Sequence, residues 1–293
     1  MNAAHAPRID PAAVRATLRA AGLRARHGLS QNFLADADVL EAILAEAHPR
    51  PGRPILEIGP GLGLLTGGLL TAGVDVTAIE LDRDLGAFLR DRFEDPIASG
   101  RLRLIEGDAL DLDLVRLVPP PYDVVANLPY HITSPTLHRL LEREPRAERL
   151  VLMVQAEVAD RIAARPGRMS YLSVFVQFHA GVQVALRVPP EAFEPAPKVA
   201  SAVIVLEPRA LRALPADRES ALWGLVQSGF RERRKMLRNV LARQLRAGPD
   251  GATGPLVGQL RVDAALQASG IEGDRRPQTL SVDDWVRLLE ALS

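Results

Sequence analysis

Short apolar runs alternate with helix-length segments over the first two thirds of the chain, and this alternation restricts the fold more than any other feature. The runs cover residues 54–59, 74–81, 101–108, 122–127 and 149–155. Apolar runs of this length, bounded by turn residues, are typical of parallel strands that helices cover on both faces. The sequence therefore predicts an α/β fold with a mainly parallel, doubly wound sheet. Two later runs, 182–188 and 201–207, are expected to form a hairpin-like pair, with an antiparallel arrangement as one option.

Helices are expected on either side of these strands. Segment 36–47 has apolar residues on one face, and Asp36 stands where an N-cap is expected. After Pro208 the sequence predicts helices and no strand. A glycine- and proline-containing link interrupts these helices at 248–255. The predicted helices of this part are 217–229, 231–246, 259–269 and 281–292. The predicted regions are therefore an N-terminal basic arm (1–30), an α/β domain (31–208) and a smaller all-helical C-terminal domain (209–293).

Composition excludes several kinds of site. The chain of 293 residues has no cysteine, so disulfides, thiolate metal sites and a cysteine nucleophile are excluded. Its six histidines are scattered, which gives a metal site little support. No apolar run reaches the roughly 18 residues of a membrane span, and the arginine-containing N-terminus does not resemble a secretory signal. These features predict a cytoplasmic enzyme or binding protein without a metal.

The net charge of zero conceals two basic segments. Residues 1–28 contain five arginines against Asp10, and residues 231–246 contain six arginines and Lys235 against Glu232. Such clustering indicates that two parts of the chain contact a polyanion. The alternative is that the two segments are helix faces exposed to solvent. Since the basic side chains of 231–246 fall on more than one helix face, some of them are expected to form intramolecular pairs.

A glycine-rich turn follows the first predicted strand. Gly59, Gly61 and Gly63 allow the backbone to turn sharply and to approach a ligand, and the helix after them favours a negative group at its N-terminus. Glu80 ends the next strand about 20 residues later, where a carboxylate accepts hydrogen bonds from ribose hydroxyls. The pair predicts a nucleoside-containing cofactor; a dinucleotide, or a turn without any ligand, are the alternatives.

Two further motifs end the third and fourth strands. Asp108 stands where it can accept from the amino group of an adenine, although such an aspartate is also a common turn residue or helix cap. Asn127, Leu128, Pro129 and Tyr130 combine a carboxamide, a fixed backbone and an aromatic ring. The carboxamide oxygen, together with the carbonyl of Leu128 or Pro129, can accept from a planar amino group while the ring stacks on its base. This combination favours transfer to an exocyclic nitrogen over hydride transfer.

At this point the chain closely resembles the ribosomal RNA adenine N6,N6-dimethyltransferase family. The resemblance begins near residue 24 and rests on motifs that occur in order along the chain. They comprise Ser30–Leu34, Glu57–Gly63, Glu80, Gly107–Ala109, Asn127–Tyr130, Phe193–Ser201, Phe230–Asn239 and Arg276–Ser281. The family usually has glycine where this chain has Ser30, which affects the loop over the cofactor but removes no expected ligand group.

The resemblance implies a Rossmann-like class I S-adenosylmethionine-dependent methyltransferase domain followed by a helical rRNA-binding domain. Its implied substrate is a pair of adjacent adenosines in the 3′-terminal hairpin loop of 16S rRNA, in the 30S subunit or its precursor, and its implied methyl donor is S-adenosylmethionine. The implied donor-binding residues are Asn32, Leu34, Gly59, Gly61, Glu80, Asp108, Ala109 and Asn127. The protein is expected to act as a monomer during ribosome biogenesis.

Catalysis is assigned to Asn127, Leu128, Pro129 and Tyr130, with Phe193 covering the other face of the adenine or, alternatively, packing in the core. The expected RNA-binding residues are Lys198, Arg231, Arg233, Arg234, Lys235 and Arg238. Tyr171 and Phe175 have helical spacing and are expected in the core. The alternatives for the whole chain are an adenine methyltransferase of 23S rRNA that confers antibiotic resistance, a non-catalytic RNA-binding factor and, more distantly, an NAD-dependent dehydrogenase.

Overall fold

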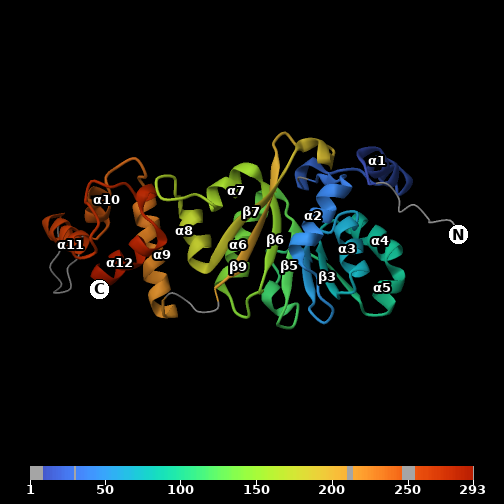
Figure 1. The fold of residues 1–293 in the computed structure, drawn as a ribbon, viewed down its shortest axis with the longest axis horizontal. Coiled ribbons are helices and arrows are strands. Elements are labelled where there is room, and N and C mark those ends of the chain that lie inside the picture. The colour runs from blue at the N-terminus through green and yellow to red at the C-terminus, as the bar shows by residue number, and fades with distance from the viewer. Residues whose placement is uncertain (1–8, 30, 210–213, 246–254, 293) are drawn as a thin grey trace. The chain divides into compact units, whose positions relative to one another are not determined.

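The computed structural model describes residues 9–29, 31–209, 214–245 and 255–292 (Figure 1). Ser30, Arg8, Arg246 and nearly all of the predicted link 248–255 lie outside the described residues. The chain divides into two compact units. The first comprises Met1–Ala159 and Gly181–Pro208, and the second comprises Asp160–Ala180 and Arg209–Ser293. One boundary between the units thus falls after Pro208, where the sequence predicts the start of the helical region. The second unit also contains residues 160–180.

A seven-stranded sheet forms the centre of the first unit, in the order β4-β3-β2-β5-β6-β9-β7. The five strands from β4 to β6 are parallel to their neighbours, and β9 is antiparallel to β6. The strands are β2 (Ile55–Ile58), β3 (Val76–Glu80), β4 (Leu102–Glu106), β5 (Asp123–Asn127), β6 (Leu150–Gln155), β7 (Ala180–Val188) and β9 (Ser201–Pro208). This order confirms the predicted Rossmann-like sheet, and β7 and β9 are neighbours as the two late apolar runs predict.

The register of the parallel strands brings their carboxyl ends to one edge of the sheet. Central strand β2 is buried at every position, and its Glu57 lies opposite Ala78 of β3 and Val125 of β5. Apolar side chains on both faces explain why these strands read as continuous apolar runs. The edge at which β2, β3, β4 and β5 end therefore collects Gly59, Glu80, Gly107 and Asn127 from four separate parts of the sequence.

Helices follow most of these strands (Figure 1). Asp36 caps α2 as predicted, because its Oδ1 accepts from the Val39 N–H at 3.0 Å. Asp10 and Asp82 cap α1 and α4 in the same way. The helices are α1 (Pro11–Ala20), α2 (Ala37–Ala47), α3 (Leu64–Thr71), α4 (Arg83–Arg92), α5 (Glu94–Ala98), α6 (Thr133–Glu142) and α7 (Ala156–Ile162), with the 3-10 turns η1 (His27–Leu29), η2 (Leu114–Arg116), η3 (Tyr130–Ile132) and η4 (Pro190–Ala192).

A second, two-stranded sheet joins distant parts of the chain. Strand β1 (Phe33–Leu34) pairs antiparallel with β8 (Phe193–Glu194), and the Ala35 N–H donates to the Ala192 carbonyl at 2.7 Å. Arg15 of α1 adds an ion pair of 2.6 Å with Glu194. The segment that contains the Gln-Asn-Phe-Leu motif is thereby attached to the proline-rich loop after β7.

The second unit is helical in its described residues, as predicted. It contains α8 (Tyr171–His179), α9 (Ala216–Phe230), α10 (Leu237–Gln244), α11 (Pro255–Ala268), η5 (Pro277–Thr279) and α12 (Val282–Leu292). Its core surrounds the fully buried Trp285. The expected burial of two aromatic residues is found: Tyr171 packs partly buried against this core, and Phe175 is fully buried with its ring centroid 6.4 Å from that of Tyr171. None of the helices that the structure describes contains an apolar stretch that could span a bilayer.

The prediction of one continuous helix over 231–246 is wrong for its first part. Residues 231–234 form turns, Lys235 lies in a bend, and α10 begins only at Leu237. Met236 is extended at φ −63° and ψ 138°, which ends helical geometry between α9 and α10. The Leu237 N–H, which as a first-turn donor has no acceptor within α10, donates to the Arg275 carbonyl at 2.8 Å. A tertiary hydrogen bond thus satisfies the start of α10, at a division that charge and periodicity alone do not indicate.

Candidate active site

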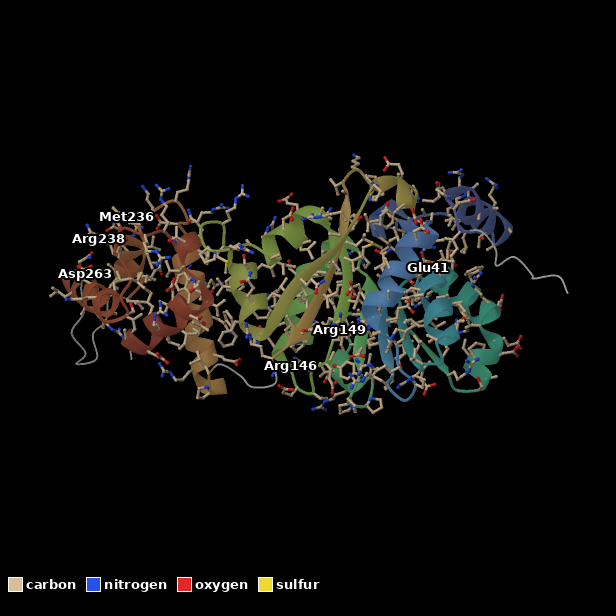
Figure 2. The ribbon with its side chains drawn as sticks, in the orientation of Figure 1. Glu41, Arg146, Arg149, Met236, Arg238 and Asp263 are labelled. Atoms are coloured by element: carbon tan, nitrogen blue, oxygen red, sulfur yellow. The ribbon has the colours of Figure 1, made fainter. Side chains whose placement is uncertain are left out.

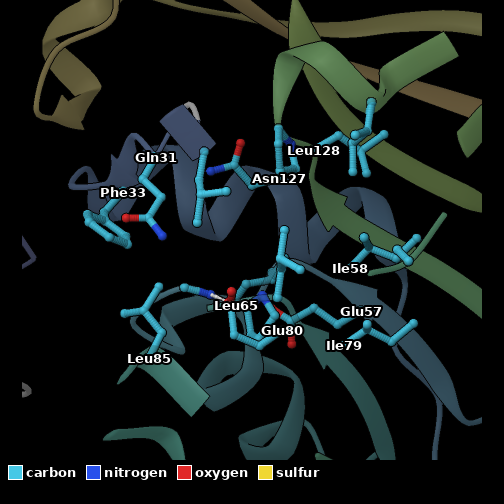
Figure 3. Close-up of a pocket in the computed structure, with 18 of the residues that line it drawn as sticks. Gln31, Phe33, Glu57, Ile58, Leu65, Ile79, Glu80, Leu85, Asn127 and Leu128 are labelled. Atoms are coloured by element: carbon cyan, nitrogen blue, oxygen red, sulfur yellow. Dashed lines mark hydrogen bonds between the residues drawn. The ribbon is translucent and has the colours of Figure 1, made fainter. Parts of the chain in front are cut away.

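A pocket opens at the carboxyl edge of the parallel strands (Figure 3). Its walls come from residues 31–34, 57–62, 79–81, 107–109 and 127–132. Every predicted donor-binding residue lines it, as do Leu128, Pro129 and Tyr130. Motifs that are separated by up to about a hundred residues in the sequence therefore meet in one cavity. This is the place where ligands bind in open α/β sheets.

The glycine turn has the backbone geometry that its sequence predicts. Gly59, Gly61 and Gly63 have φ values of 72°, 57° and 74°, a region that side chains with a Cβ rarely adopt. A Cβ on Gly63 would lie 2.4 Å from the Phe93 ring, and one on Gly61 would lie 3.2 Å from the Phe33 ring. Helix α3 begins directly after this turn, so its unpaired backbone N–H groups face the same edge of the sheet.

Glu80 is held at the end of β3 by the backbone. Its Oε2 accepts from the Gly61 N–H at 3.1 Å and its Oε1 from the Asp82 N–H at 2.9 Å. Burial raises the pKa of this carboxyl, because desolvation outweighs the two backbone hydrogen bonds. Figure 3 shows the side chain at the pocket, across from Asn127 in that view. The carboxylate is thus fixed in one orientation before any ligand arrives.

Glu57 is a buried carboxyl that the sequence-based assignment does not include among the site residues. It lines the pocket, accepts from Thr66 Oγ1 at 2.7 Å and is almost inaccessible to solvent. Burial, with a smaller contribution from the neighbouring Glu80, raises the pKa of this carboxyl to about 8, although the hydrogen bond from Thr66 lowers it. A charged residue in an otherwise apolar strand is the signal that points to it in the sequence.

Asp108 has one oxygen in use and one available. Its Oδ1 accepts from the Leu110 N–H at 2.8 Å, which is the turn-forming role that the sequence allows. Among the described residues no donor meets its Oδ2. Because Asp108 lines the pocket, its Oδ2 is available as an acceptor for a ligand.

The Asn-Leu-Pro-Tyr motif presents acceptors and a ring to the pocket. Asn127 donates from Nδ2 to the Asn32 carbonyl at 3.4 Å, which turns its Oδ1 away from that contact. The Pro129 carbonyl accepts from the Ile132 N–H at 3.1 Å, whereas no described backbone N–H donates to the Leu128 carbonyl. Tyr130 Oη lies 2.7 Å from Ser201 Oγ, and burial raises the pKa of this phenol. The tyrosine is therefore neutral at physiological pH and cannot act as a base.

Phe193 does not lie where an adenine-covering ring is expected. It is 2% exposed, packs in the core beside Leu34 and Ala192, and is not among the pocket-lining residues. Its backbone pairs with Leu34 in the two-stranded sheet. The arrangement supports the alternative that Phe193 anchors its loop. Lys198, on the same loop, is exposed.

The basic segment of the second unit has paired and unpaired cations. Arg231 donates to Gln244 Oε1 at 3.2 Å, and Arg243 pairs with Glu232 at 2.6 Å. These contacts confirm the prediction that some of the basic side chains form intramolecular pairs. Arg233, Arg234 and Lys235 are exposed, and no anion pairs with them within the described part of the chain. Arg238 and the exposed Met236 also lie at the surface of this unit (Figure 2).

Comparison with known proteins places these features in a family. The family model described as ribosomal RNA adenine dimethylase matches residues 22–286. The chain belongs to this family. Ribosomal RNA small subunit methyltransferase A of Thermosynechococcus vestitus is 44% identical over 278 residues, which cover 92% of this chain and 97% of that protein. The protein of the same name from Pseudomonas putida is 38% identical over 92% of this chain and 96% of its own length.

Solved structures of the same kind cover most of the chain. The 23S rRNA methyltransferase ErmE is 30% identical with a TM-score of 0.68, over 89% of this chain and 99% of that one. A dimethyladenosine transferase from Plasmodium falciparum is 26% identical with a TM-score of 0.72, over 87% and 95% of the two chains. The predicted family, the Rossmann-like methyltransferase fold and the dependence on S-adenosylmethionine are thereby confirmed.

Proposed function

We propose that this dimethylase-family protein methylates N6 of two adjacent adenosines in the 3′-terminal hairpin loop of 16S rRNA, with S-adenosylmethionine as the methyl donor. One observation carries the proposal. The pocket joins Glu80, Asp108 and the Asn127–Tyr130 motif at one edge of the sheet, in a chain 44% identical to a protein named small subunit methyltransferase A. We place the reaction in the cytoplasm during ribosome biogenesis, on the 30S subunit or its precursor, with the enzyme acting as a monomer.

The residues of the pocket fit the methyl donor. Apolar side chains make up most of its lining, with a few carboxylate and amide groups among them, as is usual for small-molecule sites. Glu80 would accept from the ribose hydroxyls, Asp108 Oδ2 from the adenine amine, and the N–H groups after Gly59 would face the carboxylate. Asn32, Leu34, Gly61 and Ala109 complete the walls. When bound, S-adenosylmethionine supplies a methyl group on a positively charged sulfur, which makes that carbon electrophilic.

Asn127 and Leu128 would orient the target nitrogen. The lone pair of adenine N6 is delocalised into the ring, so this amine is a poor nucleophile. Asn127 Oδ1 and the Leu128 carbonyl, each without a donor among the described residues, would accept its two hydrogens and favour a pyramidal nitrogen. As positive charge develops on N6, both acceptors stabilise it more strongly. The Leu128 carbonyl suits this role better than that of Pro129, which the Ile132 N–H already engages.

Tyr130 would hold the base. Its hydroxyl is tethered to Ser201, so the ring stays at the pocket without a ligand to order it. The base must leave its stack to reach this ring, at a cost of about a few kcal/mol that is smaller in a hairpin loop. Stacking on a preordered ring offsets part of this cost.

The second unit would bind the rRNA backbone. Arg233, Arg234 and Lys235 are consecutive, exposed cations without an anionic partner in the described residues, which is the arrangement that phosphates require. Arg231, Arg238 and Lys198 would add contacts. The domain roles follow: residues 31–208 carry the chemistry, whereas residues 209–293 and the arm at 1–30 bind RNA.

The similarity to ErmE supports a second candidate function, the methylation of an adenine of 23S rRNA. A parallel assay separates the two. Purified protein and labelled S-adenosylmethionine are given immature 30S particles, naked 16S rRNA and 50S particles, and modified nucleosides are identified by mass spectrometry. Dimethyladenosine in 30S particles alone is the expected result. Label in 50S particles would assign the second function, and intact donor binding without any label would favour a non-catalytic RNA-binding factor.

A further inference from the structure

We propose that Asp82 is a positioning residue for the methyl donor, because it holds Gln31 and thereby residues 31–34, one wall of the pocket, in place. The inference rests on the proposed role of this pocket as the donor site. Asp82 and Gln31 are outside the set of ligand residues assigned above. Their contacts connect the two sides of the pocket.

Asp82 uses both carboxylate oxygens and its backbone N–H. Its Oδ1 accepts from the Asp84 N–H at 3.0 Å and so caps α4. Its Oδ2 accepts from Gln31 Nε2 at 2.9 Å and lies 3.3 Å from Arg26 Nε. Its N–H donates to Glu80 Oε1 at 2.9 Å. With the side chain only 3% exposed, these contacts lie in a poorly hydrated place, where an unmatched polar group is costly.

The orientation of the Gln31 amide is fixed from two sides. Its Oε1 accepts from the Arg26 N–H at 2.8 Å, so its Nε2 must face Asp82. The Arg26 guanidinium also pairs with Asp84 at 2.5 Å. Rotation of the amide would place its carbonyl against the Asp82 carboxylate and its NH₂ against the Arg26 N–H. The contact therefore depends on donor and acceptor identity and not on shape alone.

Residues 31–34 reach from this contact to the opposite wall. The Asn32 carbonyl accepts from Asn127 Nδ2, and the Phe33 ring lies beside Gly61 of the glycine turn. Figure 3 shows Gln31, Phe33 and Asn127 around the pocket that Glu80 faces. The chain of contacts runs from Glu80 through Asp82 and Gln31 to Asn32 and Asn127. Loss of the Gln31 contact would loosen this wall at Asn32, which the donor would touch, while Phe33 and Leu34 stay paired with β8.

Three variants test the role of the Asp82–Gln31 contact by changing which side chain donates the hydrogen bond and which accepts it. Asp82→Asn retains an oxygen for the Asp84 N–H but sets an NH₂ against the Gln31 NH₂. Gln31→Glu sets a carboxylate against the Asp82 carboxylate. The double variant Asp82→Asn/Gln31→Glu restores a donor facing an acceptor, and the new carboxylate still accepts from the Arg26 N–H. The Arg26 guanidinium loses its contact with position 82 but keeps its pair with Asp84. Glu148→Gln, which removes an exposed charge beside Arg53, is the matched control.

The measurement is the Kd for S-adenosylmethionine and for S-adenosylhomocysteine by titration calorimetry, followed by the donor KM and kcat on RNA. We expect each single variant to raise both Kd values about tenfold, as expected for a mismatched buried polar pair. The double variant should return within about threefold of the wild type, while kcat at saturating donor changes little. Arg26→Ala, which removes only the outer cation, should raise Kd about twofold and leave thermal stability intact.

Two results would overturn the inference. One is an Asp82→Asn variant that binds the donor as well as the wild type does. The other is a double variant no better than the singles, which would reduce Asp82 to a helix cap. A wild type that binds neither compound would instead overturn the proposed function together with the inference, so the two failures are distinguishable.

Discussion

Tyr130 Oη and Ser201 Oγ lie 2.7 Å apart, although 71 residues separate them in the sequence. Ser201 is fully buried at the start of β9, and β9 pairs with β6 next to the strand that ends at Asn127. The sheet itself therefore fixes the position of the aromatic ring at the pocket. This contact also gives the serine in the Phe193–Ser201 motif a physical role that does not involve direct contact with RNA.

Removal of this tether should weaken catalysis without removing the ring. We expect Ser201→Ala and Tyr130→Phe each to lower kcat/KM for RNA about three- to tenfold, with a non-additive double variant, because both delete the same hydrogen bond. Donor Kd should not change. Steady-state kinetics measure this, with Ser99→Ala as the control. Additive losses would show that the two hydroxyls act separately.

Asn127 should affect the chemical step far more than donor binding. Asn127→Ala removes an acceptor of the N6 hydrogens, and we expect kcat to fall by about a hundredfold or more, as for the loss of one preorganised polar group. The donor Kd should rise far less, by about tenfold at most, since Asn127 also lines the donor pocket and donates to the Asn32 carbonyl. Single-turnover methylation and calorimetry give the two values. Wild-type activity in this variant would contradict the assignment of Asn127.

The exposed cations of the second unit should determine the salt dependence of RNA binding. Neutralisation of Arg233, Arg234 and Lys235 to glutamine should flatten the slope of log K against log salt by about two units, since each phosphate contact contributes about 0.7–0.9. A control variant changes Arg92, Arg101 and Arg116, which are exposed in the first unit. Equal slopes in the wild type and the 233–235 variant would rule out this patch.

Glu57 should make stability fall as pH rises. Its pKa is about 8 in the folded protein against an ordinary 4.5, so only the unfolded chain loses the proton between these values. The folded state binds more protons there, and the free energy of unfolding decreases by up to about 1.4 kcal/mol per pH unit until pH 8. Below pH 4.5 both states are protonated and the effect disappears.

Glu57→Gln tests this because the amide cannot ionise but can still accept from Thr66. We expect the variant to gain stability relative to the wild type from pH 5 to pH 8, measured by urea unfolding. Glu41→Gln, on the exposed side of α2, should show no such trend. Parallel stability curves for Glu57→Gln and the wild type would exclude a buried, protonated Glu57.

Two glycines separate backbone strain from a steric clash. Gly63 and Gly73 have similar φ values of 74° and 82°, but only at Gly63 would a Cβ meet side chains, those of Phe93 and Leu89. Gly63→Ala should therefore cost about 1–3 kcal/mol more than Gly73→Ala. Thermal or urea unfolding measures the difference. Equal losses would mean that Phe93 and Leu89 move aside freely.

The sequence is informative where function requires particular residues at strand ends. The glycine turn, Glu80, Asp108 and Asn127–Tyr130 are recognisable because their spacing reflects one edge of a parallel sheet, and all of them except Gly63 line the pocket. Phe193 is ambiguous, because a loop aromatic can face a ligand or the core with the same sequence pattern. Its burial follows from pairing with β1, a contact across about 160 residues that periodicity does not encode.

Other features depend on tertiary hydrogen bonds. At the break at Met236 the first donor of α10 is satisfied by the distant Arg275 carbonyl, and the assignment of residues 160–180 to the second unit depends on packing around Trp223 and Trp285. The Gln31–Asp82 contact could not be predicted from the sequence either, because the two residues are 51 positions apart and no local pattern pairs them. Long-range partner choice, and not local propensity, accounts for each of these differences.

The small sheet of β1 and β8 makes the donor pocket a late product of protein synthesis. Phe33 and Leu34 are made early, but their pairing partners Phe193 and Glu194 follow only when two thirds of the chain exist. A nascent chain that stops before β8 has the glycine turn and Glu80 but lacks the support for the wall that faces them. The ribosome must therefore complete most of this enzyme before the enzyme can hold a methyl donor firmly.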